Sequence, residues 1–293
     1  MSLREFAETR VKELLERFYK ELGNVSKHHD PTAIHDLRVS IRRLAEALRA
    51  LKELFPARVE VRVRGRLRRL MDLSANVRNY DIALELCTAA GISHETPQCR
   101  KMIRARKTAA RQLASCATQL KKNEILSDWK KLLVVKASGK GSWRPDASVQ
   151  ENAARQLPEV VEEYAKAGRK VAHKKAKATK LHRFRLRTKH FRYLLDLFSP
   201  FYGDDVETMS KRLREIQSLL GEINDYATVR EMMAKSSELM PLFDYLDKEQ
   251  AKKVNSFLRY WKGKMDAEGQ KKHWKKCLSN PVDGRGFPPK PSA

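Results

Sequence analysis

The sequence has few cysteines, and their spacing does not indicate the usual cysteine-based sites. Its 293 residues contain four of them, Cys87, Cys99, Cys116 and Cys277, with no CxxC pair. Neither a zinc site nor a disulfide framework is therefore indicated. A glycine-rich phosphate loop, a nucleophile elbow and a cysteine–histidine constellation are also missing from the sequence. We expect no catalytic residues, no cofactor and no metal site.

Long apolar runs are missing as well. The N-terminus has no apolar stretch of signal-peptide type, and no segment has the length and apolar character needed to span a bilayer. We therefore expect a cytoplasmic protein with no membrane partner.

The sequence has far fewer acidic than basic residues. There are 36 of them against 61 lysines and arginines, which gives a formal net charge of +25. A field of this sign predicts a polyanionic partner, such as nucleic acid, an anionic membrane surface or a phosphate polymer. The charge carries no information about the fold.

The most informative stretch that is present is a basic segment at residues 180–198, KLHRFRLRTKHFRYLLDLF. Apolar or small residues recur in it at steps of four and three, which is the spacing of a buried helix face. These predicted core positions are Phe184, Thr188, Phe191, Leu195 and Phe198. At about 100° per residue, a second set of side chains falls on a strip that flanks this face. The flanking strip carries His182, Arg185, Lys189 and Arg192.

The same pattern occurs earlier, at residues 34–51, IHDLRVSIRRLAEALRAL. The offset between the copies is constant, since 182 − 35 and 198 − 51 both equal 147. The flanking residues of this copy are His35, Arg38 and Arg42, and its core positions are Leu37, Ile41, Leu44, Leu48 and Leu51. A second pair of segments, 67–80 and 213–226, repeats at an offset of 146. A period this long indicates the duplication of a domain half rather than a solenoid.

Apolar residues at helical spacing dominate the remaining chain. The alternating stretch at 59–64 could be read as a strand, but helical spacing follows it and no partner strand is available. We predict an all-α fold of two four-helix bundles related by an internal pseudo-twofold duplication. The bundles are predicted at residues 1–137 and 148–268, with a glycine-, serine- and proline-containing linker at 138–147. Residues 269–293 are polar and then rich in proline and glycine, so we expect a disordered tail.

The repeated motif resembles that of a known family. The run His-x-Leu-Arg-Val-x-x-Arg-Arg-Leu at residues 35–44 and its echo at 182–191 are similar to the signature of the CHAD domain, a conserved-histidine α-helical domain. The segments at 77–81 and 220–225 resemble its second block, and the resemblance covers about residues 1–265. It implies two four-helix bundles with a basic central groove or pore that binds inorganic polyphosphate.

The sequence departs from the family pattern at a few positions. Asn79 replaces the usual aspartate of the second block, and Ala227 stands at the repeat position of Asp81. Arg49 of the first copy is matched by Asp196 of the second, so we expect the two halves to contribute unequally. The ExExK signature of the triphosphate-tunnel (CYTH) domain, to which some family members are fused, is absent. The chain is therefore predicted to be a stand-alone binding module.

The candidate polyphosphate-binding residues are cations in or beside the repeated segments. Guanidinium groups suit phosphate because their forked donors can bind two oxygens at once. Each assignment has a non-functional alternative. The strip could be a solvated basic helix face, and the histidines could form hydrogen bonds to a backbone carbonyl or a neighbouring carboxylate. The candidates are His35, Arg38, Arg42, Arg43, Arg49, Arg66, Arg78, His182, Arg185, Lys189, Arg192, Arg212 and Arg214.

Several functions compete for this basic surface. The leading hypothesis is non-enzymatic binding of inorganic polyphosphate, including polyphosphate granules; an acidic protein partner and the oligomeric state stay open. The alternative is nucleic-acid binding, although Phe184, Phe191 and Phe198 lie on the core stripe, which leaves few aromatics for base stacking. The pair His35-Asp36 could bind a metal ion, which would suggest a metal-dependent phosphohydrolase. Further ligands are not evident in the sequence, and Arg38 and Arg42 would repel a cation.

Overall fold

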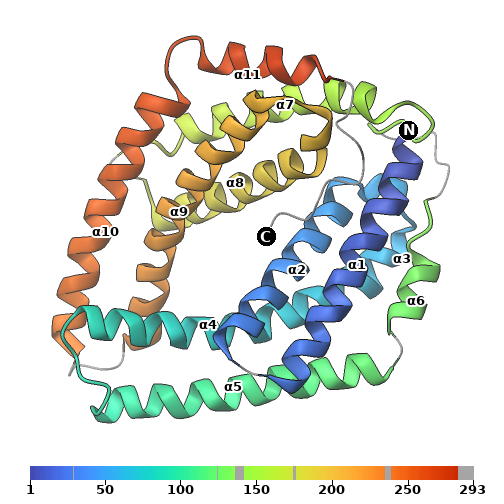
Figure 1. Ribbon diagram of the computed structural model, residues 1–293. Helices are drawn as coiled ribbons and strands as arrows, with labels where there is room; N and C mark the ends of the chain where they lie inside the picture. The colour runs from blue at the N-terminus through green and yellow to red at the C-terminus, as the bar shows by residue number, and fades with distance from the viewer. Residues whose placement is uncertain (29, 124, 136–141, 174–175, 235–238, 283–293) are drawn as a thin grey trace. The chain divides into compact units, whose positions relative to one another are not determined.

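The computed structural model describes residues 1–28, 30–123, 125–135, 142–173, 176–234 and 239–282 (Figure 1). Within these ranges every regular element is helical, and the only β-type pairing is an isolated bridge between Ser2 and Ser148. The all-α prediction is therefore confirmed. The longer helices are α1 (Leu3–Lys27), α2 (Pro31–Ala50), α4 (Gly65–Ala89), α5 (Pro97–Lys122), α6 (Ile125–Leu132), α7 (Val149–Arg169), α8 (Ala178–Phe198), α9 (Asp204–Met233), α10 (Met240–Tyr260) and α11 (Gln270–Ser279).

Short helical segments join some of these helices. The alternating stretch that could be read as a strand is helical, as predicted, because α3 (Ala57–Val59) leads into a π-helical turn at Glu60–Arg64. A second π-helical turn, Trp261–Met265, follows α10, and 3₁₀ turns occupy Lys52–Leu54 and Ser199–Phe201.

The chain divides into two compact units. The C-terminal unit contains Met1–Leu3, Asp146–Ala227 and Leu246–Ala293, and the N-terminal unit contains Arg4–Pro145 and Thr228–Tyr245. The boundary between residues 145 and 146 falls inside the predicted linker, of which residues 138–141 lie outside the described part of the chain. The predicted second bundle includes residues 228–245, whereas the structure groups Thr228–Tyr245 with the N-terminal unit. The division therefore falls within α9, a 30-residue helix about 45 Å long. The predicted domain limits stay a prediction.

The two copies of the repeated helix begin at equivalent positions. Helix α2 begins at Pro31, where the Asp30 side chain accepts a hydrogen bond of 3.0 Å from the Ala33 amide and caps the helix. Helix α8 begins at Ala178, and 178 − 31 is again 147. The matching bounds agree with the predicted duplication, which itself stays a prediction.

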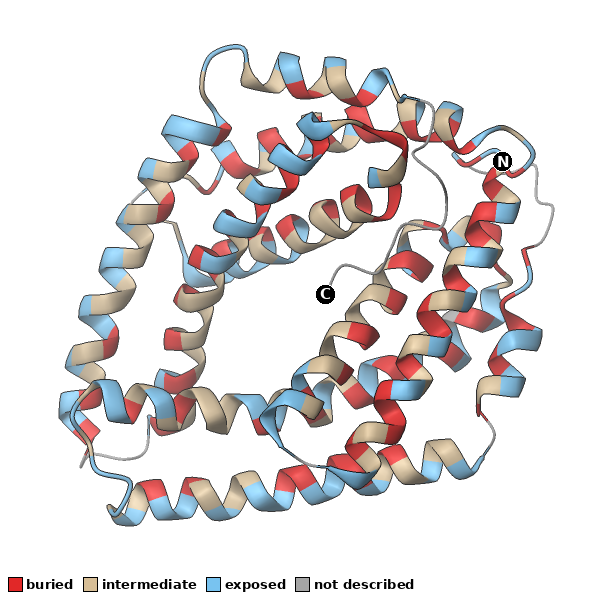
Figure 2. Cartoon of the chain, viewed as in Figure 1, coloured by how far each residue is buried: buried red, intermediate tan, exposed pale blue. Residues whose placement is uncertain are grey.

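Both helices bury the predicted stripe. All ten predicted core positions are at most 2% exposed, and Figure 2 shows buried positions recurring along each helix between exposed ones. The polar residue of the α8 stripe, Thr188, has hydrogen-bond partners. Its hydroxyl donates to the Phe184 carbonyl and lies 3.0 Å from Tyr164 Oη. The stripe of α8 joins an aromatic cluster in which the Phe184 ring lies 5.0 Å from Tyr164 and 5.3 Å from Trp261.

Residues 270–279 correct the prediction of a disordered tail from residue 269. They form α11, which packs on α7 and buries Trp274 and Leu278. Two lysines of α11, Lys271 and Lys275, pair with Glu162 of α7 at 2.9 and 3.3 Å and hold the pKa of that carboxyl below its usual value. The prediction missed this helix because its two apolar anchors are separated by basic residues. The rest of the predicted tail, 283–293, lies outside the described residues.

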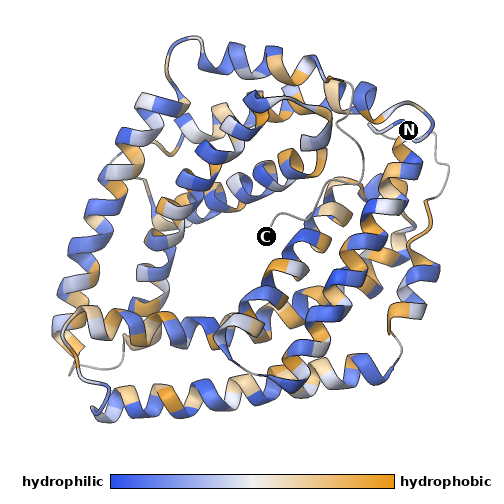
Figure 3. Ribbon diagram, in the orientation of Figure 1, coloured by the Kyte–Doolittle hydropathy of each residue, from blue (hydrophilic) through white to orange (hydrophobic). Residues whose placement is uncertain are grey.

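The helices carry hydrophilic and hydrophobic residues side by side (Figure 3). Among the helices that the structure describes, none is long and apolar enough to cross a membrane. This hydropathy pattern is typical of amphipathic helices that each bury one face.

Candidate functional site

The predicted site residues fall in both units. The N-terminal unit holds His35, Arg38, Arg42, Arg43, Arg49, Arg66 and Arg78, and the C-terminal unit holds His182, Arg185, Lys189, Arg192, Arg212 and Arg214. The structure therefore brings together the residues of each repeat within its own unit.

In the N-terminal unit, two arginines of α2 are held by neutral oxygen atoms. The Arg38 guanidinium donates to the Ser74 hydroxyl of α4 at 2.9 Å, and its Nη1 lies 3.4 Å from the Met71 carbonyl. Arg42 Nε donates to the Arg38 carbonyl one turn earlier, at 3.2 Å. Both side chains are half-buried beside the core stripe. They are thus oriented by the fold rather than extended into solvent.

Arg42 combines this orientation with an uncompensated charge. Among the described residues, no carboxylate forms an ion pair with its guanidinium, and its one hydrogen bond goes to a backbone carbonyl. A guanidinium carries five N–H donors and no acceptor. An arginine that is half-buried and held by a neutral group is well suited to bind an anion, since the anion completes its electrostatic pairing.

The other candidates of this unit are more exposed. His35 and Arg66 are exposed near the starts of α2 and α4, and Arg43 is half-buried. Arg78 pairs with Glu85 at 3.0 Å, and Arg49 lies 3.9 Å from Glu46. Exposed ion pairs of this kind contribute little to stability, so a polyanion could displace the carboxylates.

Asp81, the last residue of the segment at 77–81, has a partner within the fold. Asp81 of α4 accepts a hydrogen bond of 2.9 Å from Arg106 of α5, and both side chains are more than four-fifths buried. The repeat analysis could not predict this pairing, because Arg106 lies outside the repeated segments. The alanine at the repeat position, Ala227, cannot form the same link, which agrees with the expected inequality of the halves.

In the C-terminal unit, two strip residues of α8, His182 and Arg185, lie near α9. His182 Nδ1 lies 2.5 Å from the side-chain oxygen of Asn224, which fixes the ring. Arg185 lies against Gly221, where an added Cβ would be 3.9 Å from its Nε. Lys189, one turn further along, is half-buried. The partner of His182 is thus a side-chain amide, neither the backbone carbonyl nor the neighbouring carboxylate that the sequence analysis gave as the alternative.

Arg192 is engaged within the fold. Its Nη1 lies 2.8 Å from Asp196, its Nε donates to Gln217 of α9 at 2.9 Å, and its guanidinium stacks on the Tyr193 ring at 4.2 Å. The side chain is only 13% exposed. Its charge is neutralised by the aspartate that replaces Arg49 of the first copy, so Arg192 links α8 to α9.

The two candidates on α9 also have internal partners. Arg212 donates to the Lys264 carbonyl at 3.1 Å and to the Gln270 side chain, which ties α9 to the start of α11. Arg214 is exposed, and its Nη1 lies 3.3 Å from the Ser210 hydroxyl. Arg214 therefore remains accessible, whereas Arg212 has a structural role.

Sequence reasoning missed the neutral residues that position the cations. These residues are Ser74, Gln217 and Asn224, and all three lie within the second pair of repeated segments, 67–80 and 213–226. The sequence repeat indicates that these helices are important. The side chains that position the cations are identified by the packing of α2 on α4 and by the hydrogen bonds between α8 and α9.

Comparisons with known proteins agree on one family. A sequence model of the CHAD domain matches residues 9–234, which is more than half of the chain. Among solved structures, the crystal structure of the CHAD domain from the plant Ricinus communis has a TM-score of 0.65 and 18% sequence identity, covering 96% of this chain and 94% of that chain. PptA from Streptomyces chartreusis has a TM-score of 0.61 and 17% identity, covering 89% of this chain and 99% of that chain. A comparison with curated proteins gave no match.

At these identities the structural likeness shows the fold, while the sequence model shows the family. One family explains both the repeated histidine–arginine motif and the helical fold that buries its apolar stripe. This chain belongs to the CHAD-domain family.

Proposed function

We propose that this chain binds inorganic polyphosphate and acts as a binding module rather than as an enzyme. Its membership of the CHAD-domain family supports the proposal, because binding of this polymer is what the motif resemblance implies. The net charge of +25 supplies the long-range attraction that a polyanion requires. Such a module would act where the polymer accumulates, including polyphosphate granules.

The observation that carries the proposal is the paired strip of cations on α2 and α8. In each unit the strip flanks a stripe that is at most 2% exposed, so the stems of the cations lie beside fixed core residues. Arg38 and Arg42 in one unit and Arg185 and Lys189 in the other are spaced one turn apart. A linear polymer of phosphates needs such successive donors along a track.

The contacts of the side chains support a division into binding and positioning residues. Arg42 is oriented by a backbone carbonyl and is not paired with any described carboxylate, so we assign it to direct phosphate contact. We assign Arg38 to the same track in the N-terminal unit, and Arg185 and Lys189 to a corresponding track in the C-terminal unit, with His35 and His182 as additional donors in their own units. Arg192 and Arg212 are assigned to positioning, because their guanidinium groups serve contacts within the fold.

Nucleic acid is the rival polyanion for this surface. The three phenylalanine rings of α8, Phe184, Phe191 and Phe198, are at most 2% exposed and cannot stack on bases, and the Tyr193 ring is covered by the Arg192 guanidinium. Stacking on aromatic side chains is a main source of affinity for single-stranded nucleic acids. Burial of these rings favours a ligand that offers phosphate oxygens alone.

The test replaces the four track residues by glutamine. The variant Arg38→Gln, Arg42→Gln, Arg185→Gln and Lys189→Gln keeps hydrogen-bonding side chains but removes four charges. Hydrogen bonds to charged groups contribute about 1.5–3 kcal/mol each. We therefore expect affinity for end-labelled long-chain polyphosphate to fall by at least about 100-fold at fixed salt.

A matched control removes four charges elsewhere. Lys107 and Arg111 of α5 and Lys166 and Lys170 of α7 are exposed, and two of them lie in each unit. Their replacement by glutamine should weaken binding by less than about 5-fold, because only the long-range field changes. Equal losses in the two variants, with both helical by circular dichroism, would contradict the site. Unlabelled DNA or RNA that displaces the label as well as polyphosphate does, at equal phosphate concentration, would favour the rival function.

A further inference from the structure

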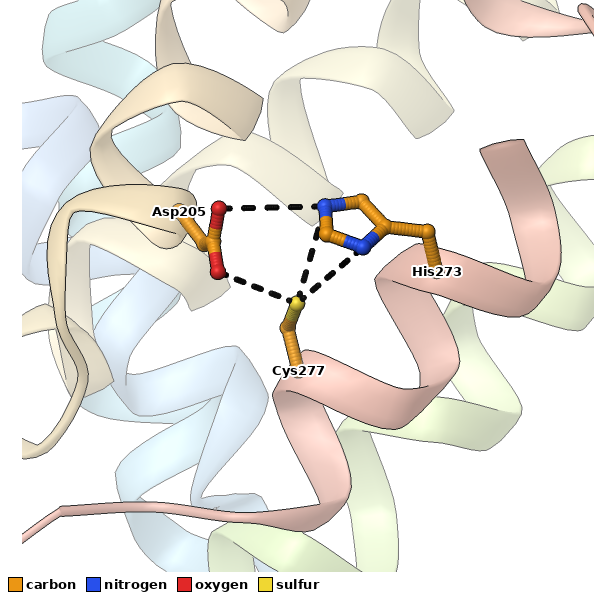
Figure 4. A group of neighbouring side chains, drawn as sticks. All are labelled: Asp205, His273 and Cys277. Atoms are coloured by element: carbon orange, nitrogen blue, oxygen red, sulfur yellow. Dashed lines mark hydrogen bonds and ion pairs between the residues drawn. The ribbon is translucent and has the colours of Figure 1, made fainter. Parts of the chain in front are cut away.

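Three side chains that commonly bind metals meet on the C-terminal unit (Figure 4). Asp205 lies in the first turn of α9, and His273 and Cys277 lie on α11. One ligand atom of each lies within 4.8 Å of the other two. None of the three residues belongs to the cationic strip, so the cluster is separate from the proposed polyphosphate site.

The distances within the cluster are close to those between ligands of one tetrahedral ion. His273 Nε2 lies 3.7 Å from both Asp205 Oδ1 and Cys277 Sγ, and Cys277 Sγ lies 3.3 Å from Asp205 Oδ2. With zinc bonds of about 2.0–2.3 Å and tetrahedral angles, neighbouring ligand atoms are about 3.3–3.6 Å apart. Small side-chain rotations would therefore bring the three donors onto a common ion.

The fold holds these residues in place. A spacing of four residues puts His273 and Cys277 on the same face of α11. The register of this helix is fixed by the burial of its Trp274 and Leu278 side chains. The Tyr202 hydroxyl, just before α9, donates to the Leu278 carbonyl at 2.9 Å in a buried hydrogen bond. The segments on either side of the cluster are thus tied together.

The donor set indicates which ions would fit. A thiolate, an imidazole and a carboxylate together are typical ligands of zinc, whereas calcium and magnesium take oxygen ligands. We propose that Asp205, His273 and Cys277 form a binding site for a divalent transition-metal ion, with zinc as the best fit. Water would complete the coordination, because the Asp205 and His273 side chains are 62% and 53% exposed.

Binding requires the loss of one proton. In the structure the Cys277 thiol donates to Asp205 at 3.3 Å. When the sulfur coordinates an ion as thiolate, the proton leaves to solvent and the carboxylate is released to bind the same ion. No oxidation or reduction is involved.

Cobalt(II) is a suitable probe because its spectrum reports on thiolate ligands. Untagged, reduced, full-length protein in phosphate-free buffer should bind one equivalent of Co²⁺, with a thiolate-to-cobalt charge-transfer band and the visible bands of a tetrahedral site. Zinc should displace the cobalt and abolish these bands. The assay contains no polyphosphate, so its outcome does not depend on the proposed function.

Two variants and one control test the assignment. Cys277→Ser should abolish the charge-transfer band, and both Cys277→Ser and His273→Gln should weaken zinc binding by at least about 10-fold. Cys116→Ser, which alters a half-buried cysteine of α5, should leave band and affinity unchanged. The absence of a charge-transfer band in the parent protein would overturn the proposal. An undiminished band and zinc affinity in a folded Cys277→Ser variant would overturn it equally.

Discussion

At the scale of single residues, Gly168 is the described glycine that leaves least room for a side chain, because Trp261 lies against it. Gly168 is buried in α7, and a Cβ built on it would lie 1.8 Å from Trp261 Cη2. The indole is itself confined, because it packs against Tyr164, Phe184 and Phe257. Only a residue without a side chain fits here, so the identity of residue 168 is set by close approach rather than by a turn.

The change Gly168→Ala should therefore destabilise the protein. Over-packing of a well-filled core costs about 1–3 kcal/mol, and the clash with a rigid ring places this substitution at the upper end. We expect urea-induced loss of helical circular dichroism at a clearly lower midpoint. This loss should outweigh the preference of alanine for helices, which is worth about 1 kcal/mol.

Gly263→Ala provides the control within the same unit. Gly263 lies two residues from Trp261, and a Cβ there would have no atom within 4 Å. Its substitution should leave the midpoint unchanged or raise it slightly. A Gly168→Ala midpoint no lower than that of Gly263→Ala would show that the indole can move aside.

At the scale of elements, α11 is the helix whose presence depends most on packing. It has ten residues and five lysines or histidines, so an isolated peptide of this length would be marginally helical at best. Its stability comes from docking on α7, with a further contact to α8. The Trp274 side chain is 4% exposed and its ring lies 6.3 Å from the Phe191 ring of α8. The pairs of Lys271 and Lys275 with Glu162 add to the same interface.

Removal of the Trp274 side chain should undock this helix. Large-to-small changes of a buried tryptophan cost about 3–5 kcal/mol, so Trp274→Ala should lower the unfolding midpoint and expose α11 to proteolysis. Lys272→Ala is the comparison, since Lys272 is exposed on the same helix and alanine favours helix formation. Equal midpoints and cleavage rates for the two variants would mean that α11 is not held by this anchor.

At the scale of the whole molecule, the charge of +25 attracts polyanions without selecting among them. Selection requires cations that are held in place, and the structure describes Arg38 and Arg42 held by hydrogen bonds in one unit and Arg185 against Gly221 in the other. Other cations are neutralised within the fold, as Arg106 is by Asp81 and Arg192 by Asp196. Under the proposed function, we therefore expect the number of phosphates contacted to be smaller than the 61 lysines and arginines of the sequence.

Salt dependence measures this number. The logarithm of the affinity should fall linearly with the logarithm of salt concentration, with a slope of about −0.7 per phosphate contacted on a single-stranded polyanion. The glutamine variant of Arg38, Arg42, Arg185 and Lys189 should therefore have a slope shallower by about 3. The four-charge control on α5 and α7 should keep nearly the parental slope. A parental slope in the track variant would mean that those side chains do not contact phosphate.

The sequence by itself determined the helices and the faces that they bury. Leu37 and Ile41 in α2, like Phe184 and Phe191 in α8, are buried as their spacing predicted. This works because the periodicity of apolar residues is local, and a regular helix converts spacing directly into a face. The same local signal placed the cations beside the core, and the doubled motif identified the family.

Tertiary structure alone decided which of these cations keeps an uncompensated charge and what the C-terminal residues do. Both Arg42 and Arg192 lie on the repeated helices, yet Arg192 bonds to Gln217 and Asp196, while the hydrogen bond of Arg42 within the described residues goes to a backbone carbonyl. Asp205 and His273 are 68 residues apart, the difference 273 − 205, and the second lies in a stretch that composition predicted to be disordered. Such pairings depend on how helices pack against each other, and local spacing does not encode the partners that packing brings together.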